Sequence, residues 1–93
     1  MIRSFRDAET ELIWQRRVSK KLPRDIQVVA LRKLYMINRA LAITDLRIPP
    51  ANRLEKLSGS RRGQYSIRIN RQWRICFRWS GDSAHDVEIV DYH

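Results

Sequence analysis

The chain has 93 residues, the size of one domain, and we expect a single domain over residues 1–93 with one modest core. A hydrophobic fraction of 43% argues against disorder, and no apolar run approaches the roughly 18 residues that cross a membrane. The opening MIRSFRDAETE turns acidic at once and lacks the apolar region of a secretory signal peptide. The single cysteine, Cys76, cannot form an internal disulfide, so the sequence favours a reducing, cytoplasmic setting.

Charge is the most informative property of the composition. Nineteen Lys and Arg oppose ten Asp and Glu, giving a net charge of +9 and an isoelectric point near 10.8. Such an excess predicts attraction to polyanions, and it favours nucleic acid as a partner. Charge alone does not separate DNA, RNA and a membrane surface, and some soluble proteins are basic without binding any of them.

Two helices are predicted in the first half of the chain, after a short strand candidate at residues 1–5. Residues 8–18 read as helix because Asp7 offers an N-cap and the charges run from acidic to basic along the segment. A second helix is predicted from about Pro23 or Arg24, where apolar residues recur at spacings of three and four. Its apolar stripe consists of Ile26, Ala30, Leu34, Ile37 and Leu41. Because little chain separates the two segments, we expect a helical hairpin.

The second half of the chain is predicted to form strands. The pair Pro49-Pro50 stops helix and holds the chain extended. Four segments rich in β-branched and aromatic residues follow, with turn-like stretches between them: RLEKL, GQYSIRIN, QWRICFRW and DVEIVDY. Period-two alternation and tight connections favour an antiparallel meander. The predicted fold class is α+β, with two N-terminal helices packed on one face of a small twisted sheet.

The same alternation places arginines on the sheet face away from the helices. Six arginines and no acid lie between Gly59 and Gly81. Guanidinium groups match phosphate bidentately and resist deprotonation, so these residues are candidates for binding nucleic acid along an open face of one sign. The alternative is that they only prevent edge-to-edge aggregation of the sheet. The six are Arg61, Arg62, Arg68, Arg71, Arg74 and Arg78.

A second basic cluster, RRVSKKLPR at residues 16–24, lies where the two helices join. It is either a solvated helix end or a surface that docks onto a large anion.

The residue types present restrict the chemistry. The chain has no HExxH, no CxxC and no Gly-rich phosphate loop, so we expect neither a metal nor any other cofactor. The remaining repertoire is Arg, Asp, Tyr and His, with Glu or Lys. This set fits metal-free RNA cleavage, in which a base takes the ribose 2′ proton, an acid protonates the 5′ leaving oxygen, and cations stabilise the phosphoryl oxygens.

Several segments carry a resemblance to a known family. The span DLRIPPANRLEKLSGSRRGQYSIRINRQWRICFRW, the closing VEIVDYH and the opening MIRSF together resemble the HigB branch of the RelE-type toxins of bacterial toxin–antitoxin systems. The match covers essentially the whole chain, and its most specific pieces are NRLEKL-G, G-YSIRIN-QWRICF and the VDYH ending. The resemblance implies a RelE-like fold, ribosome-dependent cleavage of mRNA in the decoding site, growth arrest, and neutralisation by a helix-turn-helix antitoxin.

The resemblance also implies roles for individual residues. Arg74 stabilises the transition-state phosphate, and His93 acts as general acid or base. Asp91 orients or charges that histidine, while Tyr92 stacks on a base or shares protons.

One position departs from the family pattern. Some members carry a histidine where this chain has Glu55. Either Glu55 or Lys56 substitutes for it, or the chemistry depends more on His93; Lys56 is also counted with the arginines as a residue that contacts RNA.

Strand parity complicates the end of the chain. By strict alternation Val87, Ile89, Asp91 and His93 share one side. If Val87 and Ile89 enter the core, Asp91 and His93 do so too, unless a bulge or the strand's end releases the chain.

Four ring-bearing residues are assigned no chemistry. His85 lies in a predicted turn and is expected on the surface. Trp73, Phe77 and Trp79 are expected in the core rather than as platforms for stacked bases.

The predicted function is therefore a ribosome-dependent mRNA endonuclease toxin. Its expected partners are a cognate HigA-like antitoxin, the small ribosomal subunit with mRNA, and operator DNA only through the antitoxin, with no membrane. Two alternatives remain: a non-nucleolytic, ParE-like inhibitor of DNA gyrase on the same fold, and a basic RNA-binding module without toxicity.

Overall fold

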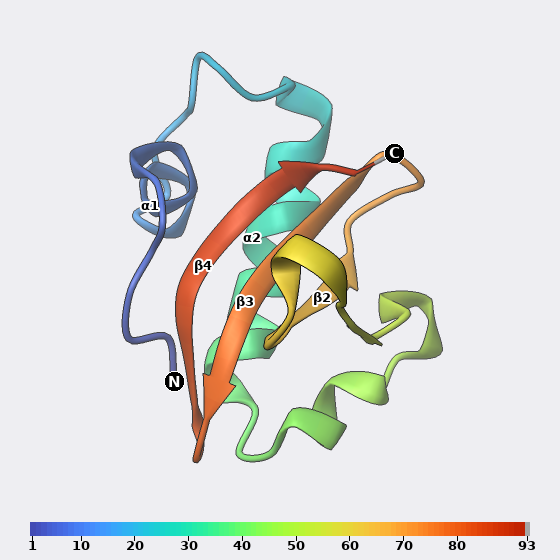
Figure 1. Ribbon diagram of the computed structural model, residues 1–93. Helices are drawn as coiled ribbons and strands as arrows, with labels where there is room; N and C mark the ends of the chain where they lie inside the picture. The colour runs from blue at the N-terminus through green and yellow to red at the C-terminus, as the bar shows by residue number, and fades with distance from the viewer. Residues whose placement is uncertain (93) are drawn as a thin grey trace.

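The computed structural model describes residues 1–92, and His93 lies outside the described residues. The helices are α1 (Ala8–Trp14) and α2 (Arg24–Arg39), and the strands are β1 (Glu55–Lys56), β2 (Gln64–Arg68), β3 (Trp73–Ser80) and β4 (Ser83–Asp91). Figure 1 shows α2 behind β3 and β4, with α1 beside β4. Helix α2 thus covers one face of the sheet and α1 packs beside β4, and the predicted α+β class is confirmed.

Helix α1 begins as predicted and ends early. The Asp7 carboxylate accepts a hydrogen bond from the Thr10 amide at 3.0 Å, which caps the first turn. Arg16 then adopts a left-handed backbone with φ 63°, and the amides of Arg16 and Arg17 donate back to carbonyls of the last turn at 2.9 Å. This arrangement terminates helices and usually has glycine at the left-handed position. The prediction of helix to residue 18 is therefore wrong, because an arginine occupies the place where glycine would have marked the end.

Helix α2 begins directly after Pro23, as predicted, and packs its apolar stripe against the sheet. The buried members of the stripe are Ile26, Ala30, Leu34 and Ile37. Leu41 does not belong to it: the helix ends at Arg39 and Leu41 is 77% exposed. The helical period cannot place a residue that lies beyond the helix.

The four strands form one antiparallel sheet in the order β1-β2-β3-β4, which confirms the predicted meander. The RLEKL segment contributes only the two residues of β1. Residues 1–5 do not form a full strand; they run parallel to β4 through two isolated bridges, Ile2 to Ala84 and Phe5 to Val87. The N-terminal segment thus covers the outer edge of β4.

A bulge in β4 sets which residues reach the core. Cys76 pairs with Glu88 and Arg78 pairs with His85, so β4 has one extra residue in this interval. Asp86, within the bulge, has a left-handed backbone with φ 52°.

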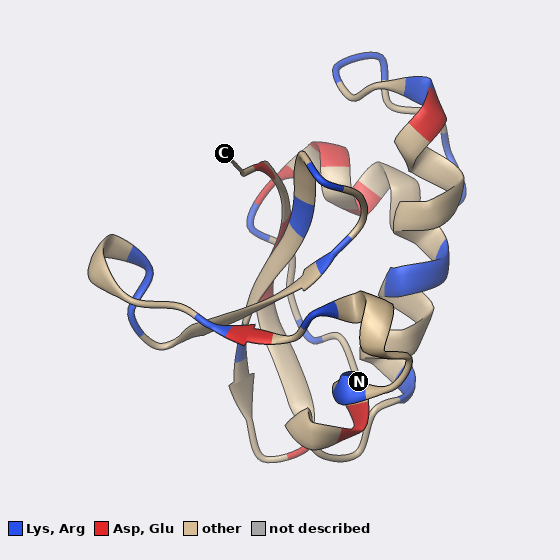
Figure 2. Ribbon diagram, turned by 90° about the vertical axis from the view of Figure 1, so that its right-hand side faces the viewer, with Lys and Arg blue, Asp and Glu red and all other residues tan. Residues whose placement is uncertain are grey.

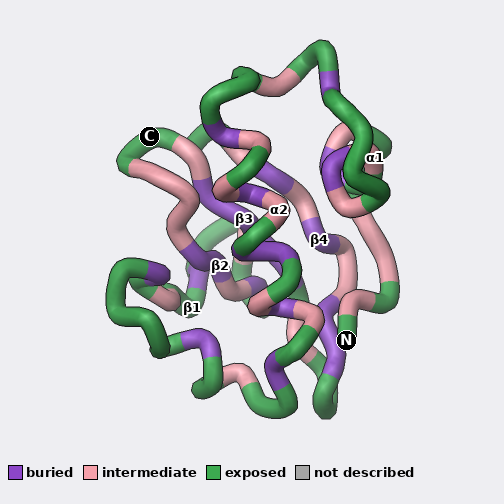
Figure 3. Tube along the Cα trace, turned by 180° about the vertical axis from the view of Figure 1, so that it is seen from behind, coloured by how far each residue is buried: buried purple, intermediate pink, exposed green. Residues whose placement is uncertain are grey.

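The core lies between α2 and the central strands. Figure 3 shows the buried segments gathered in α2, β3 and β4, and the exposed segments mainly in the loops. Phe77 is fully buried, while Trp73 and Trp79 pack against the core as partly buried side chains. The expectation that these three rings belong to the core is confirmed.

A buried polar pair attaches the long loop after α2 to the helix. The Lys33 ammonium is buried and donates to Oδ1 of Asn52, which is itself fully buried. The Asn52 amide in turn donates to the Leu46 carbonyl at 3.2 Å. Burial lowers the pKa of Lys33, and the positive charges of Arg32 and Arg68 lower it further.

Replacing the acceptor of this lysine, Asn52→Leu, is expected to destabilise the protein by about 3 kcal/mol at neutral pH, because it leaves a buried ammonium unpaired. The unfolded state binds more protons than the folded state between the lowered pKa of Lys33 and its ordinary value of 10.5. The free energy of unfolding therefore rises with pH in that window. The destabilisation caused by Asn52→Leu should shrink as the lysine becomes neutral. Urea denaturation at neutral pH and near pH 10 measures both effects.

The double variant Lys33→Met, Asn52→Leu is the control, since it removes the charge together with its acceptor. It should recover most of the stability that the single variant loses. A double variant as unstable as Asn52→Leu would show that the buried charge is not the cause.

Candidate active site

The open face of the sheet can be read from the strand register, because directly paired residues lie on the same face. One cross-strand row is Glu55–Ser66–Cys76–Glu88, and the next is Arg68–Arg74–Val90. Acidic residues thus stand on the two outer strands, and small residues stand between them.

Arg74 occupies the centre of this face and is only 7% exposed. Its Nε donates to Oγ of Ser66 at 2.7 Å, and its Nη2 donates to the carbonyl oxygens of Arg53 at 2.6 Å and Ser66 at 3.4 Å. Nη1 lies 3.7 Å from Oε1 of Glu55. The guanidinium also lies 5.8 Å from the centre of the Tyr92 ring. It is a cation held in one orientation by its neighbours.

A cleft of about 350 Å³, which we call the Arg74 cleft, opens around this guanidinium. Four of its lining residues are arginines, which makes it a place where an anion is stabilised. The lining residues are Arg53, Glu55, Arg68, Asn70, Arg71, Arg74 and Tyr92.

A second cleft of about 480 Å³, which we call the Glu88 cleft, lies farther along the same face. Its lining residues are Arg6, Ser60, Arg61, Gln64, Arg78 and Glu88. Arg61 Nη1 donates to Glu88 Oε1 at 2.7 Å, and this bond raises the pKa of the Arg61 guanidinium, which therefore stays charged.

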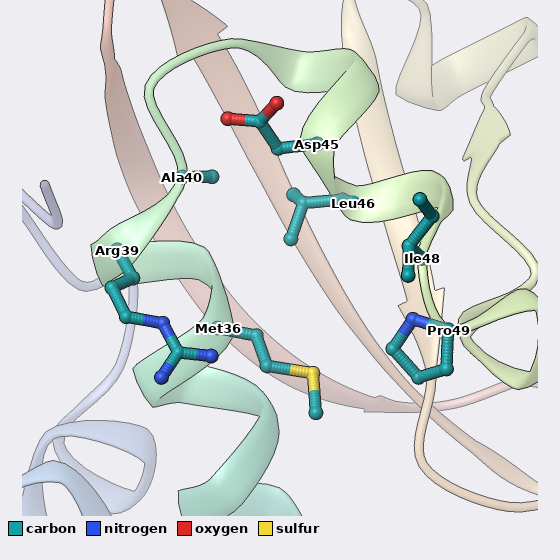
Figure 4. Close-up of a pocket in the computed structure, with 7 residues that line it drawn as sticks. All are labelled: Met36, Arg39, Ala40, Asp45, Leu46, Ile48 and Pro49. Carbon is teal, nitrogen blue, oxygen red and sulfur yellow. The ribbon is translucent and has the colours of Figure 1, made fainter.

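A third hollow, of about 430 Å³, lies between the end of α2 and the loop that follows it (Figure 4). Its lining is largely apolar, and its one carboxylate, Asp45, accepts from the backbone amides of Leu41 and Ala42. This carboxylate is committed to holding the loop, so the hollow offers little for acid–base chemistry.

The structure brings together some of the predicted catalytic residues and separates others. Arg74, Glu55 and Tyr92 meet at the Arg74 cleft. Asp91 pairs with Trp73, which places it on the helix side of the sheet, and its carboxylate accepts from Gln72 Nε2 at 3.2 Å. The bulge at Asp86 lies before Ile89 and so does not change the side on which Asp91 falls. His93, the predicted acid or base, lies outside the described residues.

The predicted RNA-binding residues divide between the two clefts. Arg68 and Arg71 line the Arg74 cleft, and Arg61 and Arg78 line the Glu88 cleft. Lys56 pairs with Tyr65 and therefore lies on the opposite face from Glu55. Arg62 is exposed and lines neither cleft.

The expectation of an open face of one sign is wrong. Acids from β1 and β4 lie among the arginines: besides Glu55 and Glu88, Asp86 lies 3.7 Å from Arg78. Figure 2 shows basic segments on the helices and loops as well as on the strands, with acidic segments among them. Sequence spacing within β2 and β3 could not reveal this, because the acids come from strands that the fold places beside them.

Sequence reasoning also missed six polar residues of the clefts: Arg6, Arg53, Ser60, Gln64, Asn70 and Glu88. Arg53 contributes a backbone carbonyl to Arg74 and has a left-handed backbone with φ 44°. No local pattern marks such a residue, since its position depends on how the loop returns to the sheet.

The remaining chemistry is limited. Cys76 is fully buried, and burial raises the pKa of its thiol, which disfavours a thiolate nucleophile. Within residues 1–92 no group of three or more His, Cys, Asp or Glu is placed to hold a metal ion. None of the helices in that range has the length and hydropathy of a membrane span.

This fold also occurs in proteins of known structure. The chain superimposes on a chain of the YoeB–YefM complex from Staphylococcus aureus with a TM-score of 0.62, covering 100% of this chain and 98% of the other at 16% identity. At that identity the likeness shows the fold alone.

Sequence comparison gives the family. Residues 3–93 match the model described as the RelE-like toxin of type II toxin–antitoxin system HigB, and the chain belongs to this family. It is 47% identical over 58 residues to Toxin HigB-1 of Vibrio cholerae serotype O1, covering 62% of this chain and 61% of that toxin. It is 31% identical over 94 residues to Endoribonuclease HigB of Proteus vulgaris, covering 100% of both chains. The match with the Vibrio relative thus spans less than two thirds of that protein.

The bonding of Arg74 leads to a stability prediction. Arg74→Lys should lower the free energy of unfolding by about 2 kcal/mol, because an ammonium cannot reach the Ser66 and Arg53 acceptors together and leaves buried oxygens unpaired. Arg78→Lys is the matched control, since the Arg78 side chain is about half exposed, and it should change stability by less than about 0.5 kcal/mol. Equal losses in urea denaturation would contradict the structural role given to the Arg74 fork.

Proposed function

We propose that this protein is a ribosome-dependent mRNA endonuclease and the toxin of a type II toxin–antitoxin pair. The observation that carries the proposal is the Arg74 cleft, where a fixed guanidinium, a carboxylate and a phenol meet among further arginines. The family membership and the full-length match to an endoribonuclease support it.

The proposed reaction is attack by a ribose 2′-oxygen on the neighbouring phosphorus. A base removes the 2′ proton, the 2′-oxygen–phosphorus bond forms, and the bond to the 5′-oxygen breaks as that oxygen takes a proton from an acid. The products are a 2′,3′-cyclic phosphate and a 5′-hydroxyl. No metal takes part in this scheme.

Arg74 stabilises the charge that builds on the phosphoryl oxygens. Its side chain is already oriented by Ser66 and Arg53, so little reorganisation is required when phosphate arrives. Of the two candidates for the position of the family histidine, Glu55 is favoured, because its carboxylate lies 3.7 Å from Arg74 while Lys56 lies on the other face.

Tyr92 and His93 complete the proposed site. The Tyr92 ring, beside the Arg74 guanidinium, is placed to stack on a base. His93 follows it in the sequence and serves as the other proton carrier. Asp91 acts through His93 by its charge rather than by contact with Arg74, since its strand position lies on the helix side.

The proposed partners follow from the family and from the charge. A helix-turn-helix, HigA-like antitoxin neutralises the toxin and carries any contact with operator DNA; the fold occurs in the YoeB–YefM complex. The small ribosomal subunit, at its decoding site in the cytoplasm, is the target that the family resemblance implies, and the net charge of +9 favours binding to such a polyanion. The basic cluster at residues 16–24 is a candidate for that docking.

Expression in a bacterium without the antitoxin tests the proposal. Wild type should arrest growth and cut transcripts within translated codons, as mapped by 5′ ends. Arg74→Ala, Glu55→Ala and a chain lacking His93 should each reduce cleavage at least about 100-fold. Lys56→Ala, next to Glu55 but on the opposite face, is the matched control and should retain most of the activity.

Other outcomes decide between the alternatives. Growth arrest with intact transcripts would instead indicate a gyrase inhibitor. Absence of growth arrest would refute the proposal that the protein is a toxin. Thermal denaturation of each variant separates loss of chemistry from loss of folding, which matters most for the buried Arg74.

The proton transfers lead to a pH prediction. Single-turnover cleavage should bend near neutral pH, because an imidazole changes its charge there, and the chain lacking His93 should lose that bend. The measurement is the rate of cleavage of ribosome-bound mRNA from about pH 5.5 to 8.5. A flat profile for the wild type would remove His93 from acid–base chemistry.

A further inference from the structure

The Glu88 cleft is not needed for the reaction at Arg74, yet it gathers groups that bind phosphate. Its arginines come from three separate segments: Arg6 precedes α1, Arg61 lies in the 3-10 turn Gly59–Arg61, and Arg78 lies on β3. Ser60 and Gln64 add a hydroxyl and an amide. Convergence of three guanidinium groups from distant parts of the chain favours an anion as the ligand.

The loop that forms one wall lies close against β3. Gly63 has φ 90°, and a Cβ at this position would lie 2.9 Å from Nη1 of Arg78. The positive φ favours glycine here, and the missing Cβ leaves room for the Arg78 guanidinium beside the turn. The turn that forms this wall therefore lies directly beside the Arg78 side chain.

Among the described residues, Glu88 is the single acid that lines this cleft, and it engages two of the three arginines. Its Oε1 accepts from Arg61 at 2.7 Å, and its Oε2 lies 3.8 Å from Nε of Arg6. The Glu88 side chain is only 14% exposed. Its two carboxylate oxygens thus face guanidinium groups as two oxygens of a bound phosphate would.

The position of the cleft relates it to the proposed reaction. Arg74 and Arg78 lie on the same face of β3, four residues apart, which corresponds to about 13 Å along a strand. A single RNA strand can therefore span both clefts.

We propose that the Glu88 cleft is a second phosphodiester site for the RNA strand that reacts at Arg74, and that Glu88 controls it by competing with phosphate for Arg61 and Arg6. This inference rests on the proposed function. In the free protein the carboxylate satisfies the two arginines, so a phosphate binds only by displacing it. This competition weakens the binding of free RNA. Productive binding is then restricted to RNA that the ribosome holds in place.

The test measures binding rather than cleavage, so it does not depend on the nuclease assay. The probe is a fluorescent single-stranded oligoribonucleotide with 2′-O-methyl groups, which cannot undergo 2′-oxygen attack. Glu88→Gln keeps the shape of the side chain and removes its charge. It should bind the probe about fivefold more tightly, and the slope of log affinity against log salt should steepen by about 0.7 for each additional phosphate that the protein neutralises.

Two further variants make the result specific. Glu11→Gln removes the same charge from an exposed position on α1, outside both clefts, and should change affinity by less than about twofold. Glu88→Gln combined with Arg61→Ala should lose the increase in affinity, because the released cation is absent. Denaturation midpoints of all variants establish that they are folded.

Glu88→Gln that binds no tighter than Glu11→Gln would overturn the proposal, as would a double variant that keeps the full increase in affinity. If Glu88→Gln fails to fold, Arg61→Gln in the wild-type background replaces it and should leave the salt slope nearly unchanged, because Glu88 already masks that arginine. A clearly shallower slope would then overturn the proposal. If the wild type cuts no transcripts in the growth experiment while the binding experiments give the expected results, the proposed function is refuted. The phosphate site remains supported in that case.

Discussion

The hydrogen bonds of the buried Arg74 guanidinium join three separate parts of the chain. They connect β3 to the hydroxyl and carbonyl of Ser66 on β2 and to the carbonyl of Arg53, just before β1. A buried charge without such acceptors is strongly destabilising, so the loop before β1 has to return to the sheet at this point. That return places Glu55 on the same face as Arg74. The geometry of the proposed site is thus a consequence of satisfying one buried cation.

A second buried cation also needs an acceptor, and it attaches the loop after α2. The Lys33 side chain of α2 is buried, and its ammonium donates to Oδ1 of Asn52. The Asn52 amide in turn donates to the Leu46 carbonyl. One residue after Asn52, the Arg53 carbonyl reaches Arg74. Two buried cations, one on each side of this short segment, therefore fix the approach to β1.

Charge on the open face is balanced locally although the chain is strongly basic. The row Glu55–Ser66–Cys76–Glu88 carries an acid on each outer strand, and each acid meets an arginine. The net charge of +9 governs long-range attraction to a polyanion, whereas these acids govern which arginines are available at contact. Attraction and productive binding are consequently separate properties, which suits a protein proposed to act on RNA already held by a large particle.

The sequence by itself determined the elements whose cause is local. The Asp7 cap, the apolar stripe of α2 and the alternation in β2 and β3 predicted the two helices, the meander and the position of Arg74 on the open face. Each of these depends on residues a few positions apart, where spacing and geometry are directly linked. The motif resemblance added the family, and it predicts that residues at the end of the chain are catalytic.

Only the tertiary structure decided which groups meet. It placed Arg53 and Glu55 against Arg74, paired Glu88 with Arg61, and put Asp91 on the helix side despite a bulge in the same strand. It also ended α1 at Trp14 by means of a left-handed arginine. These outcomes depend on strand register and on loops that satisfy buried charges from distant parts of the chain. No local pattern in the sequence contains that information, because the partners are neighbours only after the chain has folded.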